Sequence, residues 1–168
     1  MMPAAAEFDV TLKDGTIAHI RPIRPDDDRD LIEGFRQLSP ESVFQRFFSA
    51  MPELPPGMAR YLANVNYTNR LALIAEICGQ IVAVARYERT SEPDVVELGL
   101  VVLDSWQNRG LGRLLLRRIV EAAGRNGIRH FRADVLASNR RMLRLLSEEM
   151  WVEDRKFEGS IVSFRLAK

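Results

Sequence analysis

Cysteine and long apolar runs are scarce in this chain of 168 residues. Its single cysteine, Cys78, excludes an intramolecular disulfide framework and any metal site built from several thiolates, so we expect no bound metal. No apolar stretch approaches the roughly 20 residues that span a bilayer, which argues against a membrane partner. Residues 1–7 are rich in alanine but lack the basic start and apolar centre of a signal peptide. We therefore expect a cytoplasmic protein.

An excess of charge of one sign is also lacking. The chain has 24 lysines and arginines against 23 acids, which argues against a nucleic-acid-binding surface. Only Lys13, Lys156 and Lys168 are lysines, and the other basic residues are arginines. Arginine suits bidentate binding of phosphate and carboxylate, but a codon bias toward arginine is the simpler explanation of the excess. The composition, 46% hydrophobic and 28% charged, predicts a folded protein, with residues 1–168 forming one domain.

The first part of the chain predicts a hairpin and then short helices. Gly15 marks the hairpin turn, and Pro25 with the acids after it marks a helix start. Ser39 and Pro40 have the form of an N-cap and first residue of a second short helix. The expected segments are strands at 8–12 and 16–23, helices at 25–38 and from 40, a loop at 51–57 and a helix at 58–65.

The second part predicts strands that alternate with helices. The run at 94–103 is almost entirely Val and Leu, which indicates a strand buried on both faces. These elements predict one α/β domain with a mixed sheet and a single central crossover. The expected strands are 71–78, 80–88, 94–103, 128–136, 152–155 and 161–166, and the expected helices are 107–126 and 139–149.

A glycine-rich segment, residues 107–112, follows the buried strand and opens the next helix. Two glycines allow a turn that exposes consecutive amides at a helix N-terminus, where the helix dipole also favours a phosphate or pyrophosphate. A tight turn without a ligand is the alternative. A P-loop, which needs Gly-Lys-Ser/Thr, is excluded because Arg113 and Leu114 follow Gly112. A dinucleotide fingerprint is disfavoured because Leu115 stands in the place of its third glycine.

The pattern Gln-x-x-Gly-x-Gly after a strand resembles the acyl-CoA pyrophosphate loop of the GNAT superfamily of N-acetyltransferases. Three further segments resemble the acetyltransferase domain of bacterial Pat-type protein lysine acetyltransferases: residues 21–27 (RPIRPDD), 38–42 (LSPES) and 46–48 (RFF). The resemblance implies a GNAT-like fold, with a mixed, mostly antiparallel sheet, a central strand splay and flanking helices.

The resemblance also implies an activity. An acetyl group would pass from acetyl-CoA to a primary amine by direct attack, with no metal. A protein lysine is the first choice of acceptor, for example on an acyl-CoA synthetase, and a small-molecule amine is the second. A catalytically silent acyl-CoA-binding module is a third reading, and a homodimer is left open.

The resemblance assigns the donor site residue by residue. The strand before the loop would pair its backbone with the pantetheine arm, and the loop amides would hold the pyrophosphate. Asn139 matches an asparagine that touches the donor in the family, although a plain helix N-cap is an equal alternative. The implied donor-binding residues are Leu100, Val101, Val102, Gln107, Asn108, Arg109, Gly110, Leu111, Gly112, Arg113 and Asn139.

Glu97 is the candidate general base. It is the single charged residue within the run 95–103, so we expect it to be desolvated, with a pKa raised toward that of a useful base. A strand-end glutamate that reaches solvent is the alternative, and the resemblance to Pat-type domains favours catalysis. Asp134 and Glu76 are weaker candidates. Leu146 stands where many superfamily members have a tyrosine acid, but a thiolate leaves tolerably without one.

The helices before the central strands would line the acceptor side. Acids at 26–28, Glu41 and Glu53 are expected to be exposed and to attract a cationic protein surface. The phenylalanines of the same region are expected mainly to pack the helices on the sheet; they are Phe35, Phe44, Phe47 and Phe48.

Overall fold

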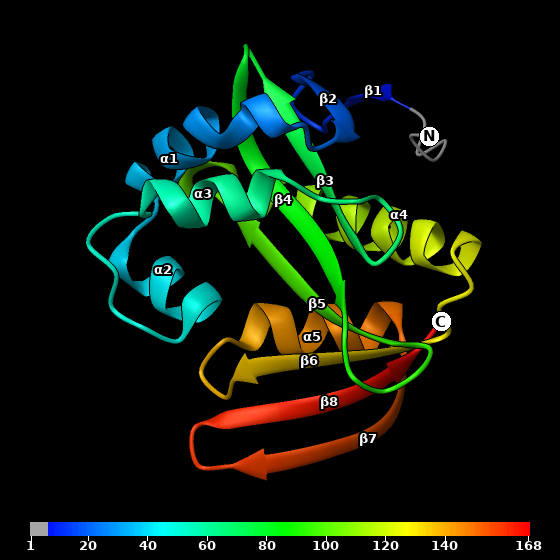
Figure 1. Ribbon diagram of the computed structural model, residues 1–168. Helices are drawn as coiled ribbons and strands as arrows, with labels where there is room; N and C mark the ends of the chain where they lie inside the picture. Colours follow the sequence, from blue (N-terminus) through cyan, green and yellow to red (C-terminus); the bar gives the residue numbers. More distant parts are fainter. Residues whose placement is uncertain (1–6) are drawn as a thin grey trace.

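The computed structural model describes residues 7–168, which form an eight-stranded sheet with helices on both faces (Figure 1). Residues 1–6 lie outside the described residues. They make up most of the segment 1–7, for which the sequence argued against a signal peptide. The strand order is β1-β2-β3-β4-β5-β6-β8-β7, and β5 pairs with β6 in parallel while the other pairs are antiparallel. The predicted mixed, mostly antiparallel sheet is therefore confirmed.

The elements follow the sequence pattern closely. The strands are β1 (Phe8–Thr11), β2 (Ile17–Pro22), β3 (Arg70–Ile77), β4 (Gln80–Arg89), β5 (Val95–Val102), β6 (His130–Leu136), β7 (Trp151–Glu158) and β8 (Ile161–Ala167). The helices are α1 (Asp28–Arg36), α2 (Pro40–Phe47), α3 (Pro56–Ala63), α4 (Leu111–Arg125) and α5 (Arg140–Glu149), with short 3₁₀ turns η1 (Pro25–Asp27) and η2 (Asp104–Trp106).

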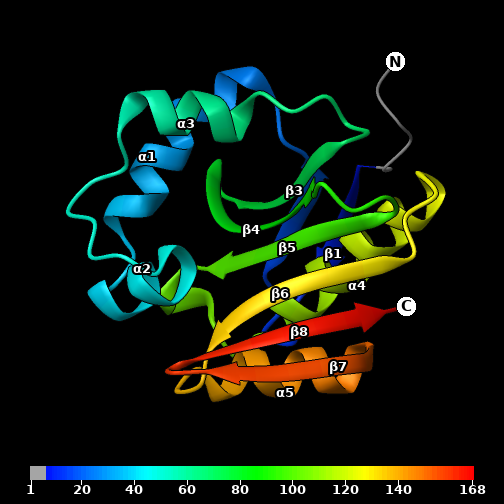
Figure 2. The ribbon, with the colours of Figure 1, turned by 60° about the horizontal axis from the view of Figure 1, so that its bottom comes forward.

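The helices divide into two layers (Figure 2). α1, α2 and α3 cover one face of the sheet, and α4 and α5 lie on the other. Because both faces of its centre are covered, β3 is buried from Leu71 to Ala75 and β4 from Ile81 to Tyr87. Within residues 7–168, no helix is both long and apolar enough to cross a bilayer.

The sheet opens between β5 and β6. These strands pair over three positions, from Val95 with His130 to Glu97 with Arg132, and the pairing then stops. β5 continues to Val102 paired with β4 alone, whereas β6 continues to Leu136 paired with β8. The predicted central splay is thus confirmed, and it begins directly after Glu97.

This splay corrects one expectation about β5. The strand was expected to be buried on both faces, but full burial stops after Val96, and residues 98–102 are only half-buried. Strand separation removes the neighbour that would have covered them. A Val- and Leu-rich run therefore marks a strand that faces a cavity here, not one enclosed by its sheet.

The start of α4 also differs from the predicted position. The helix begins at Leu111 instead of Gln107, because Asn108 and Gly110 adopt left-handed backbone conformations with φ of 61° and 88°. Two other predicted caps are confirmed. The Ser39 hydroxyl accepts a 3.1 Å hydrogen bond from the Ser42 amide, and the Asn139 side chain accepts one from the Met142 amide at 3.3 Å.

Candidate functional site

A cavity of about 530 Å³ occupies the splay between β5 and β6. Its walls come from both strands, the C-terminal part of α2, the start of α4 and the start of α5. Of the residues predicted for the site, Arg109 alone does not line it. Those that do are Glu97, Leu100, Val101, Val102, Gln107, Asn108, Gly110, Leu111, Gly112, Arg113 and Asn139.

The segment 108–113, in which every residue except Arg109 lines the cavity, carries unpaired backbone donors. None of its six amides has a hydrogen-bond acceptor among residues 7–168. The left-handed turn at Gly110 places these amides at the N-terminus of a helix of 15 residues, where the helix dipole adds positive potential. This donor set fits a pyrophosphate.

Gln107 braces the loop through its side chain. Its Nε2 donates to the Val102 carbonyl at 3.0 Å, and its Oε1 accepts a 2.6 Å hydrogen bond from Arg141 on α5. The glutamine thus connects the end of β5, the loop and α5. Its side chain is occupied in holding the loop, so the amides that follow it are the groups left for a ligand.

Asp104, which the sequence analysis did not single out, fixes α2 beside the loop. Its carboxylate accepts hydrogen bonds from the Ser39 amide (2.9 Å), the Ser39 hydroxyl (2.7 Å) and the Ser42 hydroxyl (3.1 Å). Partial burial opposes the charge, but these hydrogen bonds outweigh it and hold the pKa of Asp104 below its usual range. Asp104 therefore connects α2, on one side of the cavity, to the segment that leads into the glycine-rich loop.

Three residues predicted to bind the acyl donor use their side chains for contacts within the protein. The Arg109 guanidinium lies 4.5 Å from the centre of the Trp106 ring and pairs with Asp14. Arg113 pairs with Glu148 and Glu149 at the far end of α5. Asn139 caps α5, as its alternative interpretation required. Only backbone atoms of Arg109 and Arg113 remain available to a pyrophosphate.

Glu97 lies at the point where the strands part, and it is exposed. The expectation of a desolvated carboxylate was wrong, because the splay opens the strand to solvent directly after this residue. The carboxylate has no hydrogen bond or ion pair with any described side chain. Glu88 stands opposite it on β4, and Arg132 opposite it on β6. Glu97 thus presents an unpaired carboxylate to the cavity.

The other candidate acids differ in position. Asp134 lines the cavity, but its carboxylate accepts a 2.7 Å hydrogen bond from the Ser163 hydroxyl. Glu76 pairs with Arg21 at 3.0 Å and does not line the cavity. Leu146, at the usual tyrosine place, is buried and offers no proton.

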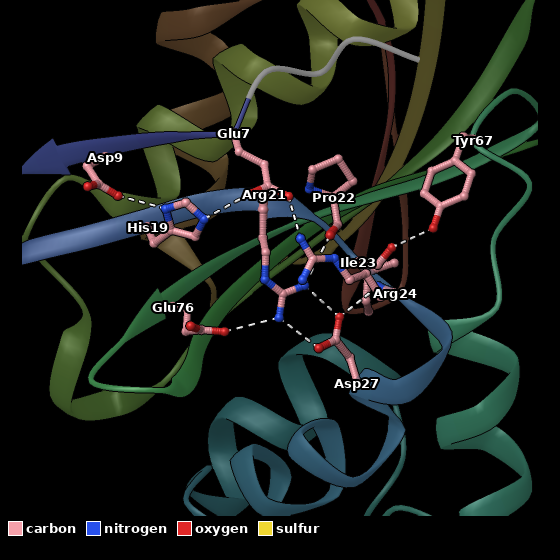
Figure 3. Close-up of polar contacts among 10 residues, drawn as sticks. All are labelled: Glu7, Asp9, His19, Arg21, Pro22, Ile23, Arg24, Asp27, Tyr67 and Glu76. Carbon is pink, nitrogen blue, oxygen red and sulfur yellow. Dashed lines mark hydrogen bonds and ion pairs between the residues drawn. The ribbon is translucent and has the colours of Figure 1, made fainter. Parts of the chain in front are cut away.

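Arg21 and Asp27 of the motif at 21–27 form a buried ion pair, not an acceptor surface (Figure 3). Arg21 donates to both carboxylate oxygens of Asp27 at 2.8 Å and to Glu76 at 3.0 Å. Burial opposes the charge of Asp27, but the hydrogen bonds from Arg21 and the Arg24 amide outweigh it and lower the pKa of this acid. The expectation that all three acids at 26–28 are exposed was therefore wrong.

The phenylalanine expectation was half right. Phe35 is buried and its ring centre lies 5.8 Å from that of Phe47, so these two pack the helices together. Phe44 and Phe48 are exposed. Phe48 ends α2 in a left-handed conformation (φ 55°) and lines the cavity, which removes it from the core.

Known proteins resemble this chain over most of its length. The sequence model of the Acetyltransferase (GNAT) family matches residues 34–150. An acetyltransferase of Pseudomonas aeruginosa, PA5475, is 29% identical over 136 residues, which cover 79% of this chain and 73% of that protein. Acetyltransferase Pat of Mycolicibacterium smegmatis is 26% identical over 150 residues, and the match spans 86% of this chain but only 45% of that protein.

A solved structure agrees with the match to Pat. The crystal structure of the GNAT domain of S. lividans PAT superposes with a TM-score of 0.92 at 32% identity, and the match covers 100% of both chains.

Proposed function

Because the chain belongs to the acetyltransferase (GNAT) family, we propose that it transfers the acetyl group of acetyl-CoA to a protein lysine, with Glu97 as general base. The proposal takes residues 1–168 as one acetyltransferase domain. The observation that carries it is the cavity in the splay, because a single space brings the donor loop and an unpaired carboxylate together.

The residues present fit acetyl-CoA. The amides of residues 108–113 would hold its pyrophosphate, and the unpaired side of β5 at 100–102 would pair with its pantetheine arm. Bound acetyl-CoA supplies an acetyl thioester, a carbonyl that an amine can attack. The half-buried Leu100 and Val102 lie in contact with the core beneath the sheet, so this wall is apolar and fixed.

Glu97 would prepare the acceptor. A lysine reaches the site as an ammonium ion, whose nitrogen has no lone pair. Transfer of one proton to the Glu97 carboxylate, directly or through water, gives the neutral amine, which forms the N–C bond as the C–S bond breaks. The acylated nitrogen then gives up a second proton to water, which leaves the amide and the thiolate. The leaving thiolate needs no acid, since a thiol pKa lies near ~8.5, and this agrees with Leu146 at the place of the tyrosine.

A protein acceptor is supported by the resemblance of residues 21–27, 38–42 and 46–48 to Pat-type protein lysine acetyltransferases and by the acids around α1 to α3 that remain exposed. Asp26, Glu41 and Glu53 are exposed there and would attract a lysine-bearing surface. Incubation with labelled acetyl-CoA and a lysate of the source cell should place the label on protein. If free polyamines or other small amines take the label far more efficiently than any protein, the acceptor is a small molecule instead.

Gly110→Val should abolish most of the stabilisation that acetyl-CoA gives. At about 100 times its dissociation constant, a ligand that binds only the folded protein adds about 2.7 kcal/mol to the free energy of unfolding. Valine disfavours the left-handed conformation at residue 110, so the amides after it lose their alignment. The measurement is the melting temperature with and without acetyl-CoA.

Gly124→Ala is the matched control for this change. Residue 124 lies on the same helix, has no left-handed backbone and has open space around a Cβ. This variant should keep the full acetyl-CoA shift. An equal shift with NADH in the unchanged protein, or a full acetyl-CoA shift in Gly110→Val, would contradict the assignment of the loop.

A further inference from the structure

Two arginines lie together under α2, on the face of the sheet that carries Glu97. Arg46 comes from α2 and lines the cavity, and Arg86 comes from β4, opposite Gly99 of β5. Arg86 is buried, and its guanidinium donates to the Leu62 carbonyl at 3.0 Å. The Arg46 guanidinium has no hydrogen-bond acceptor or ion-pair partner among residues 7–168, and it lies 5.0 Å from the centre of the Phe47 ring.

Both side chains converge on Gly99. A Cβ at that residue would lie 2.9 Å from Arg46 Nη2, 3.1 Å from Arg46 Cζ and 3.3 Å from Arg86 Cγ. The guanidinium of Arg46 therefore rests on the bare backbone of β5. Glycine at this position leaves the room that the guanidinium occupies.

The charges of these arginines are not balanced by a contacting carboxylate. Burial lowers the pKa of Arg46, and burial together with the charge of Arg46 lowers that of Arg86. The acids whose charges act on Arg46 are Glu97 and Glu88, and Glu88 is already bound by Tyr61 and by Arg70. Two desolvated cations side by side without an anion destabilise a fold. A ligand that brings an anion would remove this cost.

The position of the pair indicates which ligand supplies the anion. Along β5, Glu97 and Gly99 share the face under α1 to α3, whereas Leu98, Leu100 and Val102 face the core that contains α4. The amides that fit the donor pyrophosphate lie at the start of α4. The arginines are thus on the Glu97 side of the strand, where the proposed acceptor amine gives up its proton.

We propose that Arg46, backed by Arg86, binds a carboxylate that the acceptor carries close to its reacting amine. Residues 97 and 99 are two positions apart on one strand, a spacing of about 7 Å. An acceptor can therefore place its ammonium at Glu97 and its carboxylate at the Arg46 guanidinium, whose planar fork matches two carboxylate oxygens. This inference rests on the proposed function. The carboxylate belongs either to a free amino acid or to an acidic residue beside the target lysine.

Two pairs of acceptors distinguish these sources. The first pair is a lysine peptide with glutamate beside the lysine and the same peptide with glutamine there; the second is alanine and alaninamide. In each pair, one member has the carboxylate and the other is its amide. We expect kcat/KM to favour the carboxylate member of one pair by about 10- to 100-fold, as for a charge-assisted hydrogen bond. The pair that shows the preference identifies the source.

Arg46→Met should remove this preference by lowering kcat/KM for the carboxylate member alone. Arg46→Lys, which keeps the charge but not the fork, should retain part of it. Gly99→Ala should also reduce it, because the new methyl group displaces the guanidinium while leaving its charge in the protein. Arg36→Met is the control, since Arg36 is exposed on α1 and pairs only with Glu33 among the described residues.

The outcomes separate this inference from the proposed function. Transfer without preference in either pair, or an equal fall for both members in Arg46→Met, would overturn the carboxylate site and leave the acetyltransferase standing. No transfer to these acceptors or to any lysate protein would overturn both. The melting temperature of each variant shows whether it is folded. If Arg46→Met does not fold, the acceptor preference is measured on Arg46→Lys and Gly99→Ala instead.

Discussion

Glu97→Gln should lower kcat by about 10²- to 10⁴-fold, the usual contribution of a general base. The amide keeps the size of the side chain but cannot take the proton of an ammonium ion. Because Glu97 is exposed and has no partner within the described chain, its replacement disturbs no ion pair, and the melting temperature should barely change. The dissociation constant for acetyl-CoA should also stay the same, since the loop amides lie on α4. Steady-state kinetics and thermal shift on the same preparation measure all three.

Glu121→Gln provides the control for this experiment. Glu121 pairs with Arg118 on the outer surface of α4 and does not line the cavity. Its variant should keep the full rate. If Glu97→Gln stays within two- or threefold of the unchanged protein at neutral pH, the base lies elsewhere, and Asp134 becomes the next residue to test because it lines the same cavity.

Asp27→Ala should reduce the free energy of unfolding by about 3–5 kcal/mol, because it leaves Arg21 charged and buried without its main partner. Asp26→Ala is a matched control on the same turn. Asp26 is exposed, and its loss should change stability by less than about 0.5 kcal/mol. Chemical denaturation of both variants measures the difference. Equal, small effects would show that the ion pair adds nothing to the fold.

Asp27 also predicts a direction for the pH dependence of stability. Its pKa is lower in the folded protein than in the unfolded chain, so the unfolded chain binds its proton first as pH falls. The contribution of Asp27 is complete above the unfolded pKa, near ~3.9, and is lost as pH falls through the folded value. Asp27→Ala should therefore lose less stability than the unchanged protein over this acidic range.

Local features of the site could be read from the sequence. Gly110 and Gly112 after a strand predicted a turn with free amides, since glycine spacing and a helix start depend only on neighbouring residues. Ser39 and Asn139 were recognised as caps for the same reason. These predictions needed no knowledge of which elements meet in space.

Features that depend on distant elements could not be read in this way. The exposure of Glu97 follows from the parting of β5 and β6, and no residue of β5 predicts where the two strands separate. The burial of Asp27 follows from Arg21, six residues earlier, folding back over the 3₁₀ turn. The contact of Arg46 with Gly99 joins residues that are far apart in the chain. Periodicity identifies a strand or a helix, but it does not say what lies across from it.

The parting of β5 and β6 also bears on which strand edges of the sheet are open to another chain. An unpaired strand edge offers a row of amides and carbonyls to any other strand, and such edges promote aggregation when they lie on the outside. Here two unpaired edges face each other across the cavity in the splay. The outer edges of the sheet are β1 and β7, and β1 has only four residues. β7 carries five charged residues within six positions: Glu153, Asp154, Arg155, Lys156 and Glu158. Short length and charge both discourage pairing between molecules at these outer edges. The unpaired backbone groups of β5 and β6 instead line a cavity that can receive a small or extended ligand.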